Sequence, residues 1–473
     1  MSLPVFAVLG HPNKGKSSIV ATLAHDDSVA IGPVPGTTVR CRSYPMKVDG
    51  QVLYTLVDTP GFQRSRRALQ WMREHETTAA RHAEVVQQFV EAHRGGDLFH
   101  DEVELLGPVL GGAGILYVVD GSVPYGPEYE PEMEILRWTG RPRMALVNPI
   151  GDADHVEEWR EALGQYFNVV RVFDALTAES HKQVELLRTF GHLDESWSTA
   201  LEHAVAVLEQ EQTRRLARAA RIISDTLVEM LTLSLSRNLP ADGDPEPEKP
   251  PLERRFQEQL RSLERRCRDR VQEVYEHGRV TRVEQDLEAL EEDLFSEETW
   301  LRFGLNRGQL ATLGAGSGAV IGGTIDAALF GSSFLLGTLI GAGLGAAAGW
   351  VGANKLVETK LASIPLGGKK LVAGPTRNRS FPHVVFGRAR LHHFLVVGRT
   401  HSRRDQLACG EDGAARLDPP SDAQRRRLEA CFERLRRDWD TELVSGELAR
   451  AIEDVLASDA SRSGKTGANG RPL

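Results

Sequence analysis

The chain has 473 residues, with 57 Lys and Arg against 66 Asp and Glu, so its formal net charge is −9. This acidic balance argues against nucleic acid as a partner without excluding it. A composition of 41% apolar and 26% charged residues excludes global disorder, and the length suggests about three structural units. The four cysteines lack CxxC spacing, which argues against a disulfide framework or a zinc site and indicates the cytoplasm.

Short apolar runs alternate with helix-compatible stretches in residues 1–190. The runs lie at 5–9, 51–57, 115–119, 144–147 and 169–173. Such alternation predicts an α/β domain whose parallel sheet has helices on both faces. Between the second and third runs, residues 62–113 have a helical pattern, chiefly over 68–93, and we expect a helical hairpin inserted into the domain.

A phosphate-binding motif follows the first apolar run. Residues 10–17 read GHPNKGKS, which fits the pattern GxxxxGK[ST] between a strand and a helix-compatible stretch. In such a loop, glycine lets successive backbone N–H groups turn toward phosphate oxygens. Lys16 would neutralise the β- and γ-phosphates. The expected nucleotide contacts of this loop are those of Gly10, Asn13, Lys14, Gly15, Lys16, Ser17 and Ser18.

Two later segments would supply metal ligands and a γ-phosphate sensor. Asp58 ends an apolar run and begins DTPG, so its carboxylate would hold Mg²⁺ and the Gly61 N–H would approach the γ-phosphate. Ser17 would supply a hydroxyl ligand to the same ion. In the polar segment between these motifs, Thr38 is the candidate hydroxyl that senses Mg²⁺ and the γ-phosphate, and Thr37 is the alternative.

Taken together, GHPNKGKSS, PGTTVR and DTPG resemble the bacterial translation-factor-related GTPases of the Era and TrmE type, over approximately residues 3–180. The resemblance implies a Ras-like P-loop domain that binds and hydrolyses GTP with Mg²⁺. It places Lys16, Thr38, Gly61 and Asn13 in catalytic roles. The rest of the chain resembles a bacterial family in which such a domain precedes a C-terminal domain of unknown function, and this resemblance implies no activity.

The segment that would read the base departs from the pattern of these relatives. They carry NKxD after a strand, whereas NPIGD begins here at Asn148. Asn148 fits the pattern, but Pro149 replaces the lysine and Gly151 replaces the aspartate. That aspartate accepts hydrogen bonds from guanine N1–H and N2–H₂. Asp152 or Asp154 would have to substitute for it, so base specificity is an open question.

The residue after DTPG is also unusual. Phe62 stands where Ras-type enzymes carry a glutamine that orients water, and an apolar side chain cannot do this. In TrmE-like relatives an asparagine of the phosphate loop holds a monovalent cation, and the match of Asn13 to it implies K⁺ as a further cofactor. Two alternatives stay open, because Asn13 would equally brace the loop and Lys14 would itself supply charge. Three arginines come next, Arg64, Arg66 and Arg67. One of them could act as an arginine finger, or all three could be solvated residues at the start of a helix.

Beyond residue 190 the composition is mainly helical. Stretches rich in Leu, Ala, Glu and Arg predict long helices at 196–237 and 252–295, within a region that covers 191–304. The prolines of 238–251 predict a linker between these helices, because proline removes a backbone donor and clashes with the preceding turn.

The C-terminal part is expected to form a small α+β domain over 357–458. Residues 381–403 have a strand-like pattern and 421–457 a helical one. In such a strand His392 and His393 would point to opposite faces, which argues against a shared metal site. The small polar residues of 459–473 predict a disordered tail.

A glycine-rich apolar segment precedes that domain. Residues 308–354 contain 13 glycines and one charged residue, Asp326. Glycines four residues apart share one helical face, where another helix can approach closely. We expect 305–356 to form a glycine-zipper hairpin at the inner membrane, because basic residues flank both open ends. A buried hairpin within a soluble core is the alternative, and the same face would support a homo-oligomer.

The expected function is a GTP-binding and GTP-hydrolysing molecular switch coupled to a membrane-associated helical C-terminal region. Its partner would be the inner membrane or a membrane protein, reached through residues 308–354, and the insertion after Gly61 would convert phosphate loss into movement. Three alternatives stay open. They are a nucleotide-gated scaffold with vestigial hydrolysis, a membrane-active glycine-zipper protein, and a ribosome or RNA assembly GTPase.

Overall fold

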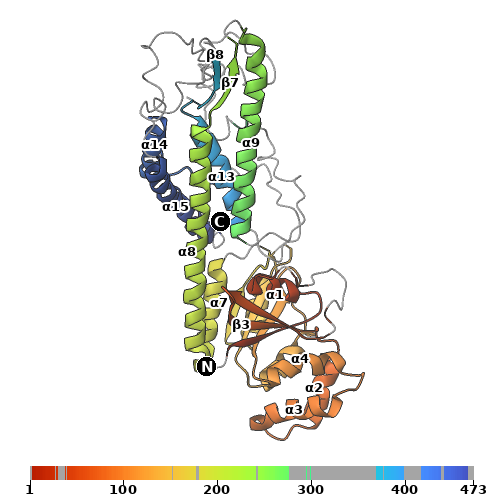
Figure 1. The fold of residues 1–473 in the computed structure, drawn as a ribbon. Coiled ribbons are helices and arrows are strands. Elements are labelled where there is room, and N and C mark those ends of the chain that lie inside the picture. The colour runs from red at the N-terminus through yellow and green to blue at the C-terminus, as the bar shows by residue number, and fades with distance from the viewer. Residues whose placement is uncertain are drawn as a thin grey trace. The chain divides into compact units, whose positions relative to one another are not determined.

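The computed structural model divides into two compact units, of which residues 1–213 form most of the first and 214–397 most of the second. The division falls within the long helix α8 (Glu195–Thr232) (Figure 1). The described residues are 3–26, 28–29, 38, 40–151, 153–176, 180–240, 243–275, 294–295, 299, 369–376, 378–398, 417–437 and 441–466. The glycine-rich segment and its expected hairpin therefore lie outside the described residues.

The first unit is built on a six-stranded sheet of order β2-β3-β1-β4-β5-β6. Its strands are β1 (Val5–Leu9), β2 (Arg42–Val48), β3 (Gln51–Asp58), β4 (Gly114–Asp120), β5 (Arg143–Asn148) and β6 (Val169–Val172). All neighbours pair in parallel except β2, which is antiparallel to β3. The five apolar runs are confirmed as strands. Strand β2 is not among the expected strands: its Met46 and Val48 are buried, but three of its seven residues are exposed and Pro45 interrupts the run.

Helices cover both faces of this sheet. Phe6 and Val8 of β1 point into a core shared with one set of helices, whereas Ala7 and Leu9 point into the core of the opposite face. Besides the helices of the insertion, the helices that pack around the sheet are α1 (Lys16–Ala24), α5 (Glu130–Trp138), α6 (Val156–Leu163) and α7 (Ser180–Leu193). Because the carboxyl ends of parallel strands meet at one edge, the loops after β1, β3, β4 and β5 open together there.

The insertion after β3 is helical, as expected, but it is not a hairpin. It contains α2 (Ser65–Glu74), a short 3₁₀ turn, α3 (His82–His93) and α4 (His100–Leu110). These helices are drawn in orange in Figure 1. The expected continuous helix over 68–93 is wrong, since the chain leaves the helical conformation before Thr78, which is extended (φ −146°, ψ 153°). Adjacent threonines are poor helix formers because of their stiff χ1 angles.

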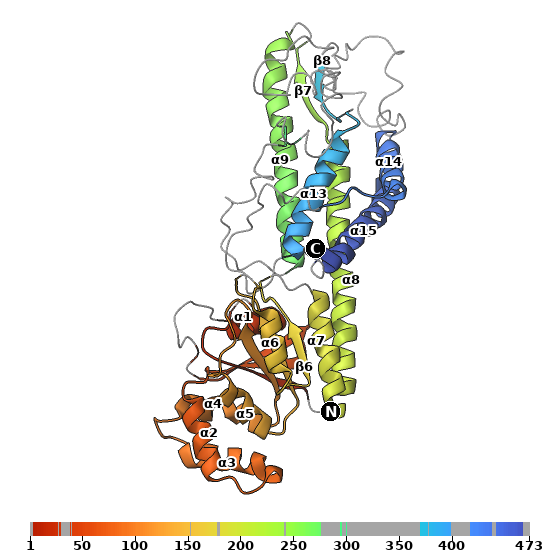
Figure 2. The ribbon, with the colours of Figure 1, turned by 180° about the vertical axis from the view of Figure 1, so that it is seen from behind.

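The second unit packs helices around one hydrophobic core beside a two-stranded sheet (Figure 2). Beyond the C-terminal half of α8, its elements are β7 (Leu235–Leu239), α9 (Lys249–Val274), β8 (Lys369–Ala373), α13 (Phe381–Val397), α14 (Asp422–Arg436) and α15 (Thr441–Thr466). Strands β7 and β8 pair antiparallel. No helix of the described ranges combines the length and apolar character that crossing a bilayer demands.

Several boundaries in this unit differ from the expected ones. The helix expected to reach residue 237 ends at Thr232, and β7 follows it across the expected boundary between helix and linker at 237/238. Pro250 and Pro251 open α9, because the first helical turn needs no backbone donors. At the other end of the chain, α15 continues to Thr466, so the expected disordered tail from 459 is wrong for its first residues.

The expected strand at 381–403 is also wrong, because the structure has α13 there and places its strand at β8. The apolar run misleads because this helix is buried nearly all round, including Arg388 and Arg390, and so has no polar face. His392 and His393 are both buried within it rather than on opposite faces of a strand. Burial lowers the pKa of His392 to about 3.

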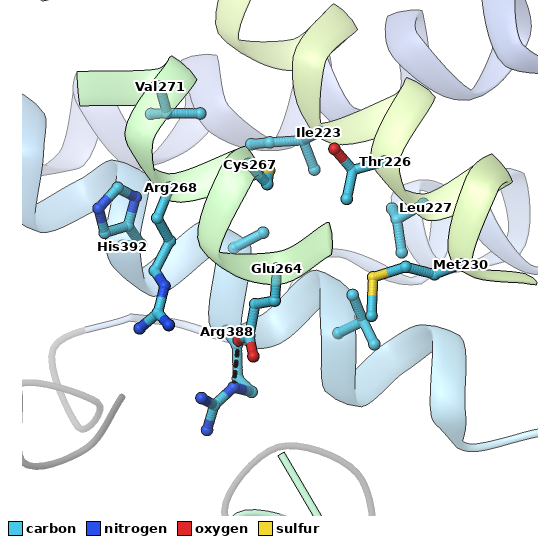
Figure 3. Close-up of a pocket in the computed structure, with 12 residues that line it drawn as sticks. Ile223, Thr226, Leu227, Met230, Glu264, Cys267, Arg268, Val271, Arg388 and His392 are labelled. Carbon is cyan, nitrogen blue, oxygen red and sulfur yellow. Dashed lines mark hydrogen bonds and ion pairs between the residues drawn. The ribbon is translucent and has the colours of Figure 1, made fainter. Parts of the chain in front are cut away.

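Two ion pairs compensate the buried arginines of α13. Arg388 Nε lies 2.5 Å from Glu264 Oε1 of α9, and Arg390 Nη2 lies 2.5 Å from Asp459 Oδ1 of α15. Figure 3 shows the Arg388–Glu264 pair beside a small cavity lined by α8, α9 and α13. The cavity volume of about 10 Å³ admits at most one water. The space beside Arg388 and Glu264 is therefore too small for a ligand larger than water.

Arg388→Met should destabilise the second unit by about 3–5 kcal/mol, because it leaves the buried Glu264 carboxylate without its partner. Urea denaturation of the full chain measures this. Arg266→Met is the matched control, since Arg266 pairs with Glu229 at the surface with both side chains more than half exposed, and its cost should stay below about 1 kcal/mol. Equal effects of the two variants would contradict a structural role for the buried pair.

Candidate functional site

The loop between β1 and α1 has the backbone conformation of a phosphate-binding loop. Gly10 (φ 140°), Asn13 (φ 60°) and Gly15 (φ 81°) all have positive φ. A Cβ atom on Gly10 would lie 2.3 Å from the Val118 carbonyl oxygen, and one on Gly15 would lie 2.3 Å from the Asn148 side chain. Glycine is thus required at both ends of the loop by conformation and by space.

Lys16, the first residue of α1, is buried beneath this loop. Its Nζ donates a hydrogen bond of 2.8 Å to the His11 carbonyl. Burial lowers the pKa of Lys16 to about 8, and the negative charges of Asp58 and Glu132 oppose that shift. The ammonium group therefore lies inside the loop whose backbone amides would surround a phosphate.

The carboxylate at the end of β3 joins two other elements of the site. Asp58 Oδ2 accepts hydrogen bonds of 2.9 Å from the Ser17 hydroxyl and of 2.9 Å from the Thr38 hydroxyl. Asp58 Oδ1 is buried and has no hydrogen-bond partner among the described residues. Burial raises the pKa of Asp58, whereas these hydrogen bonds and Lys16 lower it. Two hydroxyls and an unsatisfied carboxylate oxygen are donors that suit Mg²⁺.

Gly61 packs directly against the phosphate loop. A Cβ atom there would lie 2.6 Å from the Pro12 nitrogen, and the Phe62 N–H donates to the Gly10 carbonyl at 3.3 Å. The side chain of Phe62 is buried in the core on the insertion side of the sheet. It faces away from solvent and offers no polar atom to a water molecule.

Asn148 connects the loops on the side where a base would lie. Its Nδ2 donates to the Lys14 carbonyl at 3.3 Å, and its Oδ1 accepts from the Ala175 N–H at 3.1 Å. The apolar side chains of Ile150 and Leu176 are exposed in these same loops, at 47% and 39%. Asp152 and Thr37 lie outside the described residues.

The remaining expected residues occupy defined places. Lys14 Nζ lies 3.7 Å from Asp120 Oδ2 at the end of β4. Asn13 is exposed at the turn of the loop, and Ser18 is half-buried in the first turn of α1. The guanidinium of Arg64 donates to the Leu98 carbonyl at 2.6 Å, so in this conformation it bonds to the insertion.

Two buried glutamates near the site are not among the expected residues. Glu132 of α5 accepts from Tyr117 at 2.9 Å and pairs with His11 Nδ1 of the phosphate loop at 2.8 Å. Glu102 of α4 accepts from the backbone N–H groups of residues 63 and 64. Both share a sequence signal, because each precedes apolar residues three and four positions later and so lies on the buried face of an amphipathic helix.

Comparison with known proteins agrees with this geometry. Residues 5–107 match the family model described as 50S ribosome-binding GTPase, so the first unit carries a P-loop GTPase domain, as expected. A GTPase Der of Geotalea daltonii is 28% identical over 233 residues, which are 48% of this chain and 44% of that protein. A GTPase Der of Nitrosococcus oceani is 32% identical over 120 residues, 24% of this chain and 25% of that protein. The chain thus spans less than half the length of these curated relatives.

Solved structures with detectable similarity include two of Era. One is Aquifex aeolicus Era bound to GDP and AlF₄⁻, with 18% identity, a TM-score of 0.26 and coverage of 58% of this chain and 90% of that chain. The other is Era in complex with MgGDPNP and part of 16S ribosomal RNA, with 17% identity, a TM-score of 0.27 and coverage of 59% and 90%.

A second family model covers the C-terminal part. Residues 160–458, more than half of the chain, match the domain of unknown function DUF3482. The match begins within α6 of the first unit, well before the expected domain end at residue 190. It confirms the expectation of a C-terminal domain of unknown function. The chain therefore belongs to the DUF3482 family and combines its defining domain with an N-terminal P-loop GTPase domain.

Proposed function

We propose that this protein is a molecular switch that binds GTP with Mg²⁺ at the edge of the sheet and hydrolyses it. The observation that carries the proposal is the arrangement around Asp58. One carboxylate oxygen holds the hydroxyls of Ser17 and Thr38 together, and the other is buried without a hydrogen-bond partner among the described residues. A cation held there would sit beside the phosphate loop and Lys16.

Each residue then has a chemical task. Bound Mg²⁺ would neutralise charge on the β- and γ-phosphates, held by Ser17, Thr38 and Asp58. Lys16 would exchange its bond with the His11 carbonyl for phosphate oxygens. The Gly61 N–H would report the γ-phosphate, because this glycine already lies against the loop. Phe62 cannot orient a water molecule. The positive charge that stabilises the transition state would therefore come from a K⁺ ion held by Asn13, or from Lys14.

Guanine is the base we propose, with Asn148 as its anchor. Asn148 links the phosphate loop to the loop after β6 and would hold both around the ring, with Ile150 and Leu176 offering apolar contacts. The carboxylate that recognises guanine would be that of Asp152.

Two classes of partner follow from the remaining chain. The near-absence of charge and the spaced glycines of 308–354 support coupling of the switch to the inner membrane. The second candidate is a ribosome-assembly GTPase, favoured by the 50S ribosome-binding description of the model that residues 5–107 match. That match weighs against our expectation that nucleic acid is an improbable partner.

Lys16→Ala should lower kcat for GTP hydrolysis by at least about 100-fold, because it removes the ammonium group that is buried within the phosphate loop. Phosphate release over multiple turnovers, with and without K⁺, measures this. Lys47→Ala is the matched control, because Lys47 is exposed on β2. Turnover in the Lys16 variant equal to that of the Lys47 variant would contradict the assignment, and no turnover in the unaltered chain would favour a scaffold with vestigial hydrolysis.

Asn148→Ala should weaken GTP and GDP binding alike, by about 10-fold, because its hydrogen bonds lie on the base side and not at the γ-phosphate. Thr38→Val provides the contrast and should weaken only the triphosphate. Dissociation rates of fluorescent GDP and of a fluorescent non-hydrolysable GTP analogue distinguish the two. A selective loss of triphosphate binding in the Asn148 variant would overturn its proposed place beside the base.

The membrane proposal predicts that the full chain floats with anionic vesicles and that Gly341→Leu abolishes flotation, since a large side chain would separate the helices. Recovery of the chain only in the lipid-free fractions would reject it. Co-sedimentation with 50S subunits in the presence of a GTP analogue, but not of GDP, would instead support the ribosome-assembly candidate.

A further inference from the structure

The insertion contacts both loops that surround the catalytic side of the proposed nucleotide site. One contact comes from Glu102 of α4, whose side chain is fully buried with Leu105, Leu106 and Val109. A buried carboxylate is costly unless it is hydrogen-bonded. Glu102 Oε1 accepts from the N–H groups of Gln63 at 2.8 Å and Arg64 at 2.5 Å, the segment immediately after Gly61.

A second contact comes from Glu104, two residues further along the same helix. Its Oε1 accepts from the Cys41 N–H at 2.9 Å, and its carbonyl accepts from the Cys41 thiol at 3.2 Å. Cys41 lies three residues after Thr38, immediately before β2. Glu104 thereby holds the segment that carries the proposed Mg²⁺-sensing hydroxyl.

The two segments held by α4 also meet at the proposed metal ligand. Thr38 donates to Asp58, and Gly61 follows Asp58 by three residues. Each loop is thus attached at one end to the Asp58 region and at the other to a carboxylate of the same helix. Bonds from backbone amides to a charged acceptor are stronger than those to a neutral one. A displacement of either loop would therefore be transmitted to α4.

We propose that α4 is a built-in clamp on both switch segments, with Glu102 and Glu104 as positioning residues for hydrolysis. The inference rests on the proposed GTPase function and explains how the insertion is regulated by the γ-phosphate. When Thr38 and Gly61 engage the triphosphate, α4 holds both loops closed. When phosphate leaves, both attachments loosen together and the insertion moves.

The clamp is built to be released. Glu102 Oε2 is buried and has no hydrogen-bond partner among the described residues, so only one of its two carboxylate oxygens is compensated. Incomplete compensation makes the closed arrangement less stable than a fully bonded one would be. By reciprocity, a partner that binds the insertion and shifts α4 would change the affinity of the site for the triphosphate.

The test uses the full chain with Glu102→Ala and Glu104→Ala, and with Glu102→Gln as a rescue that retains an acceptor oxygen. Glu91→Ala is the matched control, because Glu91 is an exposed carboxylate of α3 that accepts a hydrogen bond from Gln87 on the same helix. Hydrogen exchange at the amides of Cys41, Gln63 and Arg64 is measured together with kcat and the affinity for GDP.

The clamp predicts that each alanine variant lowers kcat by about 10-fold, a loss of roughly 1.4 kcal/mol in transition-state stabilisation, while GDP affinity changes less than about 2-fold. Glu102→Ala should also speed exchange at Cys41, and Glu104→Ala should speed exchange at Gln63 and Arg64. Glu102→Gln should lie between Glu102→Ala and the unaltered chain, because it keeps an acceptor but not its charge, and Glu91→Ala should match the unaltered chain.

Exchange that rises only in the segment each residue contacts would overturn the clamp, because the loops would then be held independently. Absence of GTP hydrolysis in the unaltered chain would contradict the proposed function instead, and the cross-segment exchange would still decide whether α4 couples the loops. If Glu102→Ala fails to fold, the Glu104→Ala variant alone decides, through the exchange rate of the Gln63 and Arg64 amides.

Discussion

The hydrogen bonds of Asp58 to Ser17 and Thr38 are the interaction on which the proposed site depends. They bring together the end of β3, the start of α1 and a loop that is otherwise remote in sequence. The sheet makes this meeting possible, because β1 and β3 pair in parallel with Val8 beside Asp58 and therefore end at the same edge. A carboxylate placed there is buried, and one of its oxygens has no hydrogen-bond partner in the part of the chain that the structure describes, which is why we propose a cation at this position.

The position of the proposed site at this edge of the sheet explains why the insertion contacts it. A chain that leaves β3 after Gly61 must return to begin β4, and the returning helix α4 passes both loops. Its carboxylates accept hydrogen bonds from the part-buried backbone amides of those loops. The buried Glu132 of α5 holds the phosphate loop through a second contact, with the partly exposed ring of His11. Glu102 and Glu132, both on apolar faces of their helices, thus support two different loops of one site, the segment after Gly61 and the phosphate loop.

The sequence predicts the parts of this molecule whose signal is local. The five parallel strands are continuous apolar runs, and glycines define the phosphate loop, so the sequence predicts both. Thr38 could be placed beside Asp58 from motif order alone. Strand β2 was not predicted because Pro45 interrupts its short alternation of apolar and polar residues. Glu102 and Glu132 were not predicted because their partners are backbone amides and side chains distant in sequence.

The second unit was harder to predict because tertiary contacts override its local pattern. Arg388 and Arg390 interrupt the apolar pattern of α13, so its sequence shows no separate polar and apolar faces. Their burial is explained by ion pairs with Glu264 and Asp459, which lie far away in the chain. Pro250 and Pro251 read as breakers although a first helical turn accepts them. Such positions depend on what packs against them, which a single sequence does not reveal.

The binding of a magnesium–triphosphate pair at Asp58 is measured most directly by calorimetric titration of the full chain with GTP, once in Mg²⁺ and once in EDTA, with ATP titrated in parallel. We expect saturable binding of GTP that weakens by at least about 10-fold without Mg²⁺, and weaker binding of ATP. A folded chain that binds neither triphosphate, or that binds GTP equally with and without Mg²⁺, would contradict the role assigned to Asp58.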